Sequence, residues 1–391
     1  MKILFVVNNF NFGGPQKALL NLLYELENCE VELFLVSLNG RGSLTRYVPD
    51  YVKILKLKSK YALLTLNKKN FSKHFFQNII HPILLFKSIK AIYEINKNQN
   101  NNAKIKQAFW IDNKFNELPF SDNFDYVIGV SSGHSIYFAR DNVKANVKLG
   151  WIRTDYNVLK RNNKMDNEYF SDIDGFISVS NKCKEIFLDI FGDKNVKTFY
   201  NPLPLKLYDN IPDANFIKDN NKYTIATICR LDKDKGLDLL IESAKIIKEQ
   251  KLNIEWIIVG EGKLNDWLLN EIKNNGLQEI VKPIGFHINT GSIIKKIDLL
   301  VHPSRYEGKS NTIDEALLFN KPVLATNFST VEEQINHRNN GIIVEMDPNS
   351  IFQEIKKFYL GEYKFDNLKK KEINKGEEFL QLLNDFNKGG N

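Results

Sequence analysis

The chain has 391 residues, of which 43% are hydrophobic and 26% are charged, and its formal net charge is +7. A chain of this length is too long to fold around a single ordinary hydrophobic core. It suits two domains of about 200 residues each. No apolar run reaches the ~18 residues that span a bilayer, so the composition argues against an integral membrane protein. The three cysteines lie far apart and form no CxxC pair, which argues against disulfides or a zinc site and favours a reducing cytoplasm.

Short apolar runs alternate with helix-period segments in the first half of the chain. The run at residues 3–7 breaks at asparagines before a signal-peptide core could form, so it is predicted to be a buried strand. A helix is expected over 15–27. Further strands are predicted at residues 31–36, 126–130, 147–151 and 176–179. The alternation indicates parallel β-α-β units.

Most of the positive charge lies in residues 52–118, where 13 lysines face only three acidic side chains. Near 68–97 the lysines are interleaved with phenylalanine, isoleucine and leucine. This pattern fits a helix at an anionic membrane surface, and it equally fits a solvated helix with its apolar side in the core. Lysine without arginine is a poor set for reading bases, so no nucleic-acid partner is expected.

Prolines, asparagines and aspartates concentrate at residues 201–221, where no hydrophobic period survives, and we expect the interdomain linker there. A second alternation follows. It predicts strands at 224–228, 254–259, 299–302 and 323–325, and helices at 236–249, 264–274 and 311–320. We therefore predict an α/β protein with Rossmann-like domains at 1–203 and 204–370 and a C-terminal helix within 371–391.

Residues 302–316 are the most informative segment. They follow a predicted buried strand and open a helix that Ser310 is expected to cap. The first N–H groups of such a helix, beginning at Asn311, favour a phosphate without a metal. Glu307 and Glu315 flank this position, and carboxylates beside a phosphate are favourable where they accept hydrogen bonds from ribose and sugar hydroxyls. The combination predicts a nucleotide-sugar site.

In this strand, loop and helix setting, Glu307 and Glu315 form an E-x7-E signature that resembles that of the retaining glycosyltransferases of family 4. The resemblance implies the GT-B fold, in which two Rossmann-like parallel-sheet domains face each other across a cleft, with the donor held by the second domain and the acceptor by the first. It implies that Glu307 is catalytic and lies by the donor sugar, and that Glu315 holds the ribose hydroxyls. It also implies that the final helix crosses back to the first domain.

A second match is the segment 229–236, which resembles the family's G-R-L-x-x-x-K-G sequence with Cys229 in place of the usual glycine. The resemblance assigns Arg230 and Lys235 to the donor diphosphate. The planar guanidinium of Arg230 can donate two hydrogen bonds to the oxygens of a phosphate, and the ammonium of Lys235 can attract the same phosphate as a point charge. Together they would stabilise the charge on the leaving diphosphate and do the work of Mg²⁺.

Two further stretches of the second half match the family. Residues 259–262 resemble its strand-ending G-x-G turn, which includes Gly262, and residues 283–287 lie where family members hold the base. Backbone groups near Phe286 and His287 are expected to read the base edge, although His287 equally fits an ordinary loop histidine. No GxGxxG fingerprint is present at the glycine sites, which argues against an NAD enzyme.

The first half carries four more candidates. Gly13 and Gly14 resemble the family's G-G loop, where glycines let backbone approach a phosphate or the acceptor, with a tight turn as the alternative. Residues 149–156 resemble a segment that usually reads W-I-H-T-D, with Arg153 in place of the histidine near the reacting sugar. Arg153 is therefore a catalytic candidate that could bind phosphate or an anionic acceptor. His134 is a further cleft candidate, with a capping or loop role as the alternative.

The predicted activity is retaining, metal-independent transfer of a hexose-type sugar from a nucleotide-diphosphate donor, UDP being the commonest type. The acceptor is expected to be a glycan or a lipid-linked glycan of surface polysaccharide, lipopolysaccharide or capsule. Two D-x-D matches, at 172–174 and 232–234, do not suit a metal site, because the first precedes its strand and the second belongs to the phosphate loop. We expect neither a metal nor a cofactor.

The expected location is the cytoplasm, with peripheral contact to the inner face of the cell membrane if the basic segment near 68–97 binds lipid. Two alternatives for the function stay open. One is transfer to a soluble acceptor. The other is a catalytically silent partner that binds nucleotide sugars, which the presence of Arg153 in place of a histidine motivates.

Overall fold

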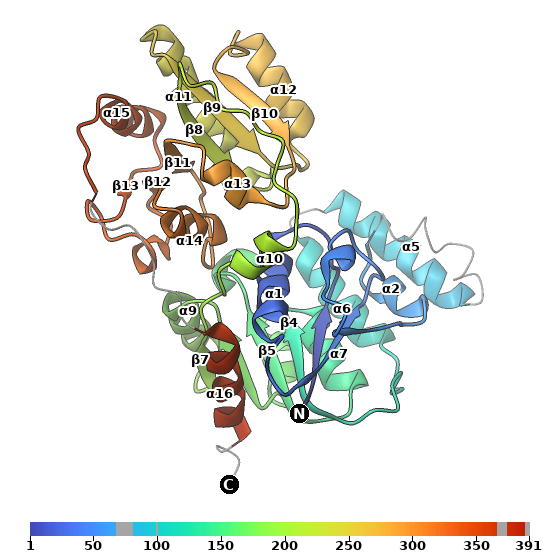
Figure 1. Ribbon diagram of the computed structural model, residues 1–391. Coiled ribbons are helices and arrows are strands. Elements are labelled where there is room, and N and C mark those ends of the chain that lie inside the picture. The colour runs from blue at the N-terminus through green and yellow to red at the C-terminus, as the bar shows by residue number, and fades with distance from the viewer. Residues whose placement is uncertain (68–80, 99–100, 366–373, 388–391) are drawn as a thin grey trace. The chain divides into compact units, whose positions relative to one another are not determined.

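The computed structural model describes residues 1–67, 81–98, 101–365 and 374–387, and it divides into two compact units (Figure 1). The first unit comprises Met1–Pro202 together with Asn374–Asn391, and the second comprises Leu203–Ile373. Parts of the predicted basic segment near 68–97 and of the predicted tail at 371–391 lie outside the described residues. Among the described residues, no helix combines the length and the apolar character needed to cross a bilayer.

A parallel sheet forms the centre of the first unit, and its described strands follow the order β3-β2-β1-β4-β5-β6-β7. The strands are β1 (Lys2–Val7), β2 (Glu32–Ser37), β3 (Lys53–Leu55), β4 (Phe124–Val130), β5 (Ala145–Ile152), β6 (Gly175–Ser178) and β7 (Val196–Thr198). In β1 every residue after Lys2 is buried. Such continuous apolar runs are typical of parallel strands covered on both faces, which confirms the strands predicted in this half.

Helices connect and cover these strands. They are α1 (Gly14–Glu25), α2 (Lys60–Leu64), α5 (Pro82–Lys97), α6 (Asn102–Asn113), α7 (His134–Asn142), α8 (Asn163–Phe170), α9 (Asn181–Phe191) and α16 (Lys375–Asn387). The last of these, red in Figure 1, lies within the first unit. Its Phe379 ring stacks on Phe5 and Trp151, with centroids 6.1 and 5.7 Å apart, so the chain's last described helix is part of the core around β1 and β5.

The second unit has its own parallel sheet, in the order β10-β9-β8-β11-β12-β13. Its strands are β8 (Tyr223–Ile228), β9 (Ile254–Val259), β10 (Val281–Gly285), β11 (Leu299–His302), β12 (Val323–Thr326) and β13 (Ile342–Val344). Its helices are α10 (Leu205–Asp209), α11 (Leu237–Glu249), α12 (Asn265–Asn274), α13 (Thr290–Ile294), α14 (Asn311–Leu318) and α15 (Pro348–Tyr359). The strands and helices predicted for this half are confirmed.

The segment interpreted from the sequence as a linker is more ordered than expected. It begins with α10, and Tyr208 and Phe216 are both buried in the second unit. The boundary between the units falls at Pro202 and Leu203. The prolines and asparagines here therefore remove the periodic pattern of hydrophobic residues from the sequence, but the segment still packs against the second unit.

Each sheet has a point at which the strand order reverses. In the first unit this point lies between β1 and β4, and in the second between β8 and β11. At each reversal point, the loops that follow the two strands begin next to each other at the carboxyl edge of the sheet. Open α/β sheets bind their ligands at this position. This topology brings the loops at 229–236 and 303–310 together in the second unit. In the first unit it brings together the loops that begin at Asn8 and Ser131.

Candidate functional site

The two loops at the reversal point of the second sheet are in direct contact. Gly236 has a φ of +63°, and a Cβ at this position would lie 1.9 Å from the carbonyl oxygen of Pro303. Only glycine fits so close an approach together with a left-handed backbone. The glycine that ends the first loop therefore allows the second loop, which carries Glu307, to lie directly against it.

Glu307 is the centre of a cluster of charged and polar side chains from these loops. Its Oε1 lies 2.6 Å from Lys235 Nζ and 3.0 Å from His302 Nε2. Burial alone would raise the pKa of the Glu307 carboxyl, but the charge of Lys235 and the hydrogen bond from His302 outweigh burial and lower that pKa to about 2. Glu307 is therefore ionised and fixed in one orientation. The sequence predicted Glu307 and Lys235 as neighbours of one ligand, and the structure pairs them directly.

The start of α14 is held by contacts on both sides of Ser310. As predicted, the Ser310 hydroxyl caps the helix by accepting from the N–H of Ile313 at 3.4 Å. Gln334 holds the backbone of Ser310 through two hydrogen bonds, of 2.8 Å to its N–H and 2.7 Å to its carbonyl. A buried ion pair joins Lys309 Nζ to Asp314 Oδ2 at 2.6 Å. These contacts fix the positive end of the α14 dipole beside the Glu307 cluster.

Arg230 and Glu315, the other charged residues predicted for the donor, have opposite surroundings. The Arg230 side chain is 60% exposed, and its Nε lies 3.4 Å from Asp232 Oδ2. Glu315 is only 2% exposed, and its Oε2 accepts hydrogen bonds from the hydroxyls of Tyr208 and Thr290, each at 2.6 Å. Burial and the neighbouring Glu315 charge raise the pKa of Tyr208 well above its usual value. Hydroxyl partners were expected for Glu315 from a ligand, and in the structure the protein supplies two of them.

The remaining candidates of the second unit lie on neighbouring loops and on α14. A Cβ at Gly262 would lie 2.2 Å from the carbonyl oxygen of Leu231, so the loop after β9 packs against the loop after β8. Phe286 and His287 follow β10 and are half-buried, and His287 Nε2 is 3.1 Å from the carbonyl oxygen of Ile284. Asn311 is the first residue of α14 and is also half-buried.

In the first unit, the structure brings together the glycine loop and Arg153. Gly13 is the N-cap of α1 and Gly14 is its first residue. Arg153 directly follows β5, and its Nη2 donates to the carbonyl oxygen of Pro15 at 3.3 Å. Its guanidinium carbon lies 4.5 Å from the centre of the Trp151 ring. Burial lowers the pKa of Arg153 to about 9. The side chain therefore keeps its charge at neutral pH.

His134 has the surroundings of a packed side chain. Its ring stacks on Trp110 with centroids 5.0 Å apart, and its Nε2 is 3.1 Å from the carbonyl oxygen of Lys106. Burial lowers the pKa of His134 to about 4. His134 is the first residue of α7, so a neutral, buried imidazole of this kind favours a structural role at the helix start over the cleft role, where the sequence left a capping or loop role as the alternative.

Residues 210–378, which include every predicted donor-binding residue, match the family model of the group 1 glycosyl transferases. The matched residues make up most of the second unit. The resemblance seen in the E-x7-E segment and in the loop at 229–236 is thereby confirmed.

Curated relatives extend the match beyond the second unit. The glycosyltransferase is 28% identical over 343 residues to the N-acetylgalactosamine-N,N'-diacetylbacillosaminyl-diphospho-undecaprenol 4-alpha-N-acetylgalactosaminyltransferase of Campylobacter jejuni, covering 83% of this chain and 88% of that enzyme. It is 27% identical over 339 residues to the O-antigen biosynthesis glycosyltransferase WclY of Escherichia coli, covering 84% and 80%.

Solved structures share the fold of the glycosyltransferase at low identity. Anabaena HepE, solved in complex with UDP and glucose, has a TM-score of 0.64 and 15% identity, with 98% of this chain and 99% of that chain covered. A Staphylococcus aureus TarM variant, solved with fondaparinux, alpha-GlcNAc-glycerol and UDP, has a TM-score of 0.64 and 14% identity, with 99% of each chain covered. The two Rossmann-like units are those of the GT-B fold, as predicted.

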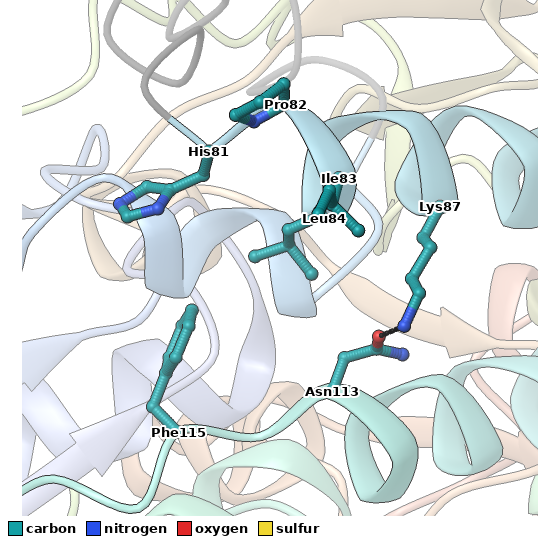
Figure 2. A pocket seen from close by; sticks show the side chains of 7 residues that line it. All are labelled: His81, Pro82, Ile83, Leu84, Lys87, Asn113 and Phe115. Carbon is teal, nitrogen blue, oxygen red and sulfur yellow. Dashed lines mark hydrogen bonds between the residues drawn. The ribbon is translucent and has the colours of Figure 1, made fainter.

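The glycosyltransferase also has a pocket of about 390 Å³ in its first unit, between the start of α5 and the end of α6 (Figure 2). Its walls include Leu84 and Phe115, and Lys87 Nζ donates to Asn113 Oδ1 at 3.0 Å across it. None of the residues predicted from the sequence as catalytic or donor-binding lines this pocket. Most of its lining residues, from His81 to Lys87, belong instead to the described part of the basic segment.

Three of the four aspartates of the two D-x-D matches have partners for their side chains in the described part of the protein. Asp172 forms an ion pair with Arg140, Asp174 accepts from the N–H of Lys148 at 2.7 Å, and Asp232 accepts from the N–H of Lys233 at 3.0 Å. In the described part of the glycosyltransferase, no group of three or more His, Cys, Asp or Glu side chains is placed to hold a metal ion. The contacts of both motifs serve local turns and strand ends.

Proposed function

We propose that the chain is a retaining, metal-independent glycosyltransferase that moves a sugar from a UDP-sugar to a glycan or lipid-linked acceptor of a bacterial surface polysaccharide. One observation carries the proposal. Arg230, Lys235, the fixed start of α14 and the ionised Glu307 meet at the reversal point of the second sheet. This set offers cationic and helix-dipole partners for a diphosphate beside a carboxylate for a sugar.

In the proposed reaction the acceptor oxygen bonds to the anomeric carbon of the donor sugar as the bond from that carbon to the diphosphate oxygen breaks. The proton of the acceptor hydroxyl passes to the departing phosphate oxygen. Arg230, Lys235 and the N–H groups at the start of α14 stabilise the negative charge that develops on the diphosphate. Glu307, held by Lys235 and His302, stabilises the positive charge that develops on the sugar ring.

The donor and the stereochemistry are proposed from the relatives. The C. jejuni relative is named as a 4-alpha-transferase and a further S. aureus relative as an alpha-N-acetylglucosaminyltransferase. Where the donor sugar is α-linked to its diphosphate, an α product means retention of configuration. The complexes of HepE and TarM contain UDP, which supports the choice of base. Glu315, oriented by Tyr208 and Thr290, is the proposed partner of the ribose hydroxyls.

The donor proposal predicts thermal stabilisation by one nucleotide sugar in the presence of EDTA. A saturating donor should raise the unfolding temperature by roughly 5–10 °C, since a ligand at about 100 times its Kd stabilises by about 2.7 kcal/mol. Arg230→Ala should weaken donor binding by about 10-fold or more, because it removes a charged partner of the phosphate. Differential scanning fluorimetry with a panel of UDP-, GDP- and ADP-sugars measures both effects.

The control for this experiment is Lys273→Ala, which removes an exposed cation from the last turn of α12, and donor affinity should be unchanged. Absence of stabilisation by every donor would contradict the nucleotide-sugar proposal, and stabilisation only with added Mg²⁺ would contradict metal independence. Stabilisation without sugar transfer and without slow donor hydrolysis would favour the silent-partner alternative.

We further propose that the enzyme works at the inner face of the cell membrane through the outer face of α5. There Ile83, Phe86 and Tyr93 are 74%, 70% and 68% exposed, while Ala91 and Ile95 of the same helix are buried. Lys87, Lys90 and Lys97 are exposed on α5 as well. Apolar and cationic side chains together on a helix surface favour binding to anionic lipid.

The membrane proposal predicts that Ile83→Ser combined with Phe86→Ser lowers binding to vesicles containing anionic lipid by about 10-fold or more, because each side chain inserted into lipid contributes about 1.5–3 kcal/mol. Vesicle co-sedimentation measures the affinity. The matched control is Ile217→Ser, which replaces an isoleucine that is 86% exposed in the second unit. Equal vesicle binding by all variants would contradict the membrane proposal and favour a soluble acceptor.

A further inference from the structure

A buried ion pair lies at the start of α14, within the segment that the two glutamates of the E-x7-E signature enclose. Lys309 Nζ is 2.6 Å from Asp314 Oδ2, and the two side chains are only 2% and 4% exposed. Gln334 holds the backbone of the next residue, Ser310, through both its N–H and its carbonyl. A buried ion pair rarely stabilises a fold more than well-packed apolar side chains would. Stability alone therefore gives little reason for two charges at these positions.

The charge of Asp314 has the wrong sign for the ligand proposed at this end of α14. Asp314 lies in the first turn of the helix, where a carboxylate interacts favourably with the positive end of the dipole. A diphosphate at the same helix end would be attracted by the dipole and repelled by that carboxylate. Water screens buried charges weakly. At an effective dielectric constant of about 20, one unpaired charge about 10 Å from the ligand changes its affinity by about 10-fold or more.

Lys309 removes this repulsion from inside the fold. Its ammonium is held against Asp314 and is shielded from solvent, so it acts on a bound ligand through its charge and not through a hydrogen bond. The same arrangement recurs at Glu307, whose carboxylate is 2.6 Å from Lys235 Nζ. Two carboxylates near the start of α14 are thus each paired with a lysine of the protein.

We propose that Lys309 is an affinity-determining residue of the donor site that acts without touching the donor. By neutralising Asp314, it keeps the start of α14 attractive to a diphosphate. The inference rests on the proposed function, because it takes the anion at this helix end to be the diphosphate of a nucleotide sugar. It adds to the two glutamates of the E-x7-E signature a requirement for a neutral charge balance between them.

The test uses the full chain and titrates UDP by calorimetry with EDTA present. Lys309→Gln keeps a hydrogen-bond donor beside Asp314 but removes the positive charge, and it should raise the Kd of UDP by about 10-fold. Asp314→Asn removes the negative charge and should leave that Kd unchanged or lower it. The double variant has neither charge, so its Kd should stay within about threefold of that of the unmodified chain. A pH of about 8 keeps carboxylates ionised even where burial disfavours their charge.

The sign of the effect separates this role from a structural one. Each single variant leaves one buried charge unpaired, so both should lower the unfolding temperature, and the double variant should recover part of the loss. If loss of structure governed UDP binding, Lys309→Gln and Asp314→Asn would weaken it alike. That result, or an unchanged Kd in Lys309→Gln, would overturn the proposal.

A second comparison serves if Lys309→Gln alone does not fold. At a pH of about 6, which favours the charged form of a buried ammonium, Asp314→Asn should bind UDP at least about threefold more tightly than the double variant, because only the former keeps the Lys309 charge. Equal affinity of these two chains would also overturn the proposal. The matched control is Lys245→Gln, which breaks the 2.7 Å pair with Glu242 on the surface of α11 and should leave the Kd of UDP unchanged.

Failure of this inference and failure of the proposed function give different results. If the unmodified chain binds neither UDP nor any nucleotide sugar, the proposed function fails and the inference fails with it. If the unmodified chain binds UDP but the affinity does not follow the charge of the Lys309 and Asp314 pair, only the role of Lys309 is overturned.

Discussion

Replacing Glu307 by glutamine should lower kcat for sugar transfer by about 100-fold or more and leave the Kd of the donor within a few-fold. Glutamine keeps the shape of the side chain but removes the charge that Lys235 and His302 hold in place. A preorganised charge that acts mainly in the transition state contributes on the order of 3–4 kcal/mol, so its loss should appear in kcat and not in binding. Initial rates with the donor identified by thermal stabilisation, together with calorimetric Kd values, measure the two quantities.

A matched control for this substitution is Glu354→Gln. Glu354 lies on α15 in the same unit and also pairs with a lysine, since its Oε1 is 2.8 Å from Lys357 Nζ. The rate of transfer should be unaffected. A Glu307→Gln enzyme that keeps a kcat within about threefold of the unmodified chain would assign Glu307 to holding the loop, not to the reaction.

The same substitution should change how stability depends on pH. The pKa of Glu307 in the folded chain is about 2, below the ordinary value of 4.5. A lowered folded-state pKa means that the ionised carboxylate stabilises the fold fully above about pH 4.5, and that this stabilisation is lost as the pH falls from 4.5 towards 2. The difference corresponds to about 3 kcal/mol. Urea unfolding at pH 7 and at pH 3 should show a large stability gap between the two chains at pH 7 and a smaller gap at pH 3.

The sequence predicted those parts of the fold and site that are local in the chain. Parallel strands covered on both faces need continuous apolar runs, and helices beside them need a 3.6-residue period, so most of the strands and helices were visible. The cap at Ser310 was visible for the same reason, because its partner Ile313 is three residues away. The contact between Lys235 and Glu307 required only the topology, which places the loops after β8 and β11 at one edge of the sheet.

What the sequence did not predict depends on residues that are distant in the chain. Tyr208 reaches Glu315 across 107 positions and Gln334 reaches Ser310 across 24, and neither pair has a spacing that a helix or strand would reveal. His302 was within the motif, but its role became visible only when Nε2 was seen at Glu307. Strands as short as β3, β7 and β13 hold three residues each, which is too few for a periodic signal. These contacts are set by tertiary packing.

The largest change in stability is expected at Asp166, a residue of α8 in the first unit. Asp166 is fully buried, and its carboxylate accepts from Arg161 Nε at 2.7 Å, from Arg161 Nη2 at 2.8 Å and from the Tyr156 hydroxyl at 2.5 Å. Burial alone would lower the pKa of Arg161, but its hydrogen bonds to Asp166 and the charge of Asp166 raise it. The Arg161 guanidinium in turn packs against Gly133, where a Cβ would lie 2.8 Å from Nη1. The pair therefore supports the loop at the reversal point of the first sheet.

Asp166→Asn should lower the free energy of unfolding by about 3–5 kcal/mol, because it leaves Arg161, whose side chain is only 11% exposed, without a counter-charge. The matched control is Asp172→Asn, whose carboxylate is 58% exposed and also pairs with an arginine, and its cost should stay below about 1 kcal/mol. Combining Asp166→Leu with Arg161→Met should recover much of the loss, since both charges are then removed together. Urea unfolding of the full chain measures all three. If Asp166→Asn and Asp172→Asn cost the same, the buried pair does not hold the loop, and the position of Gly133 must depend on the packing of α7 against β4 instead.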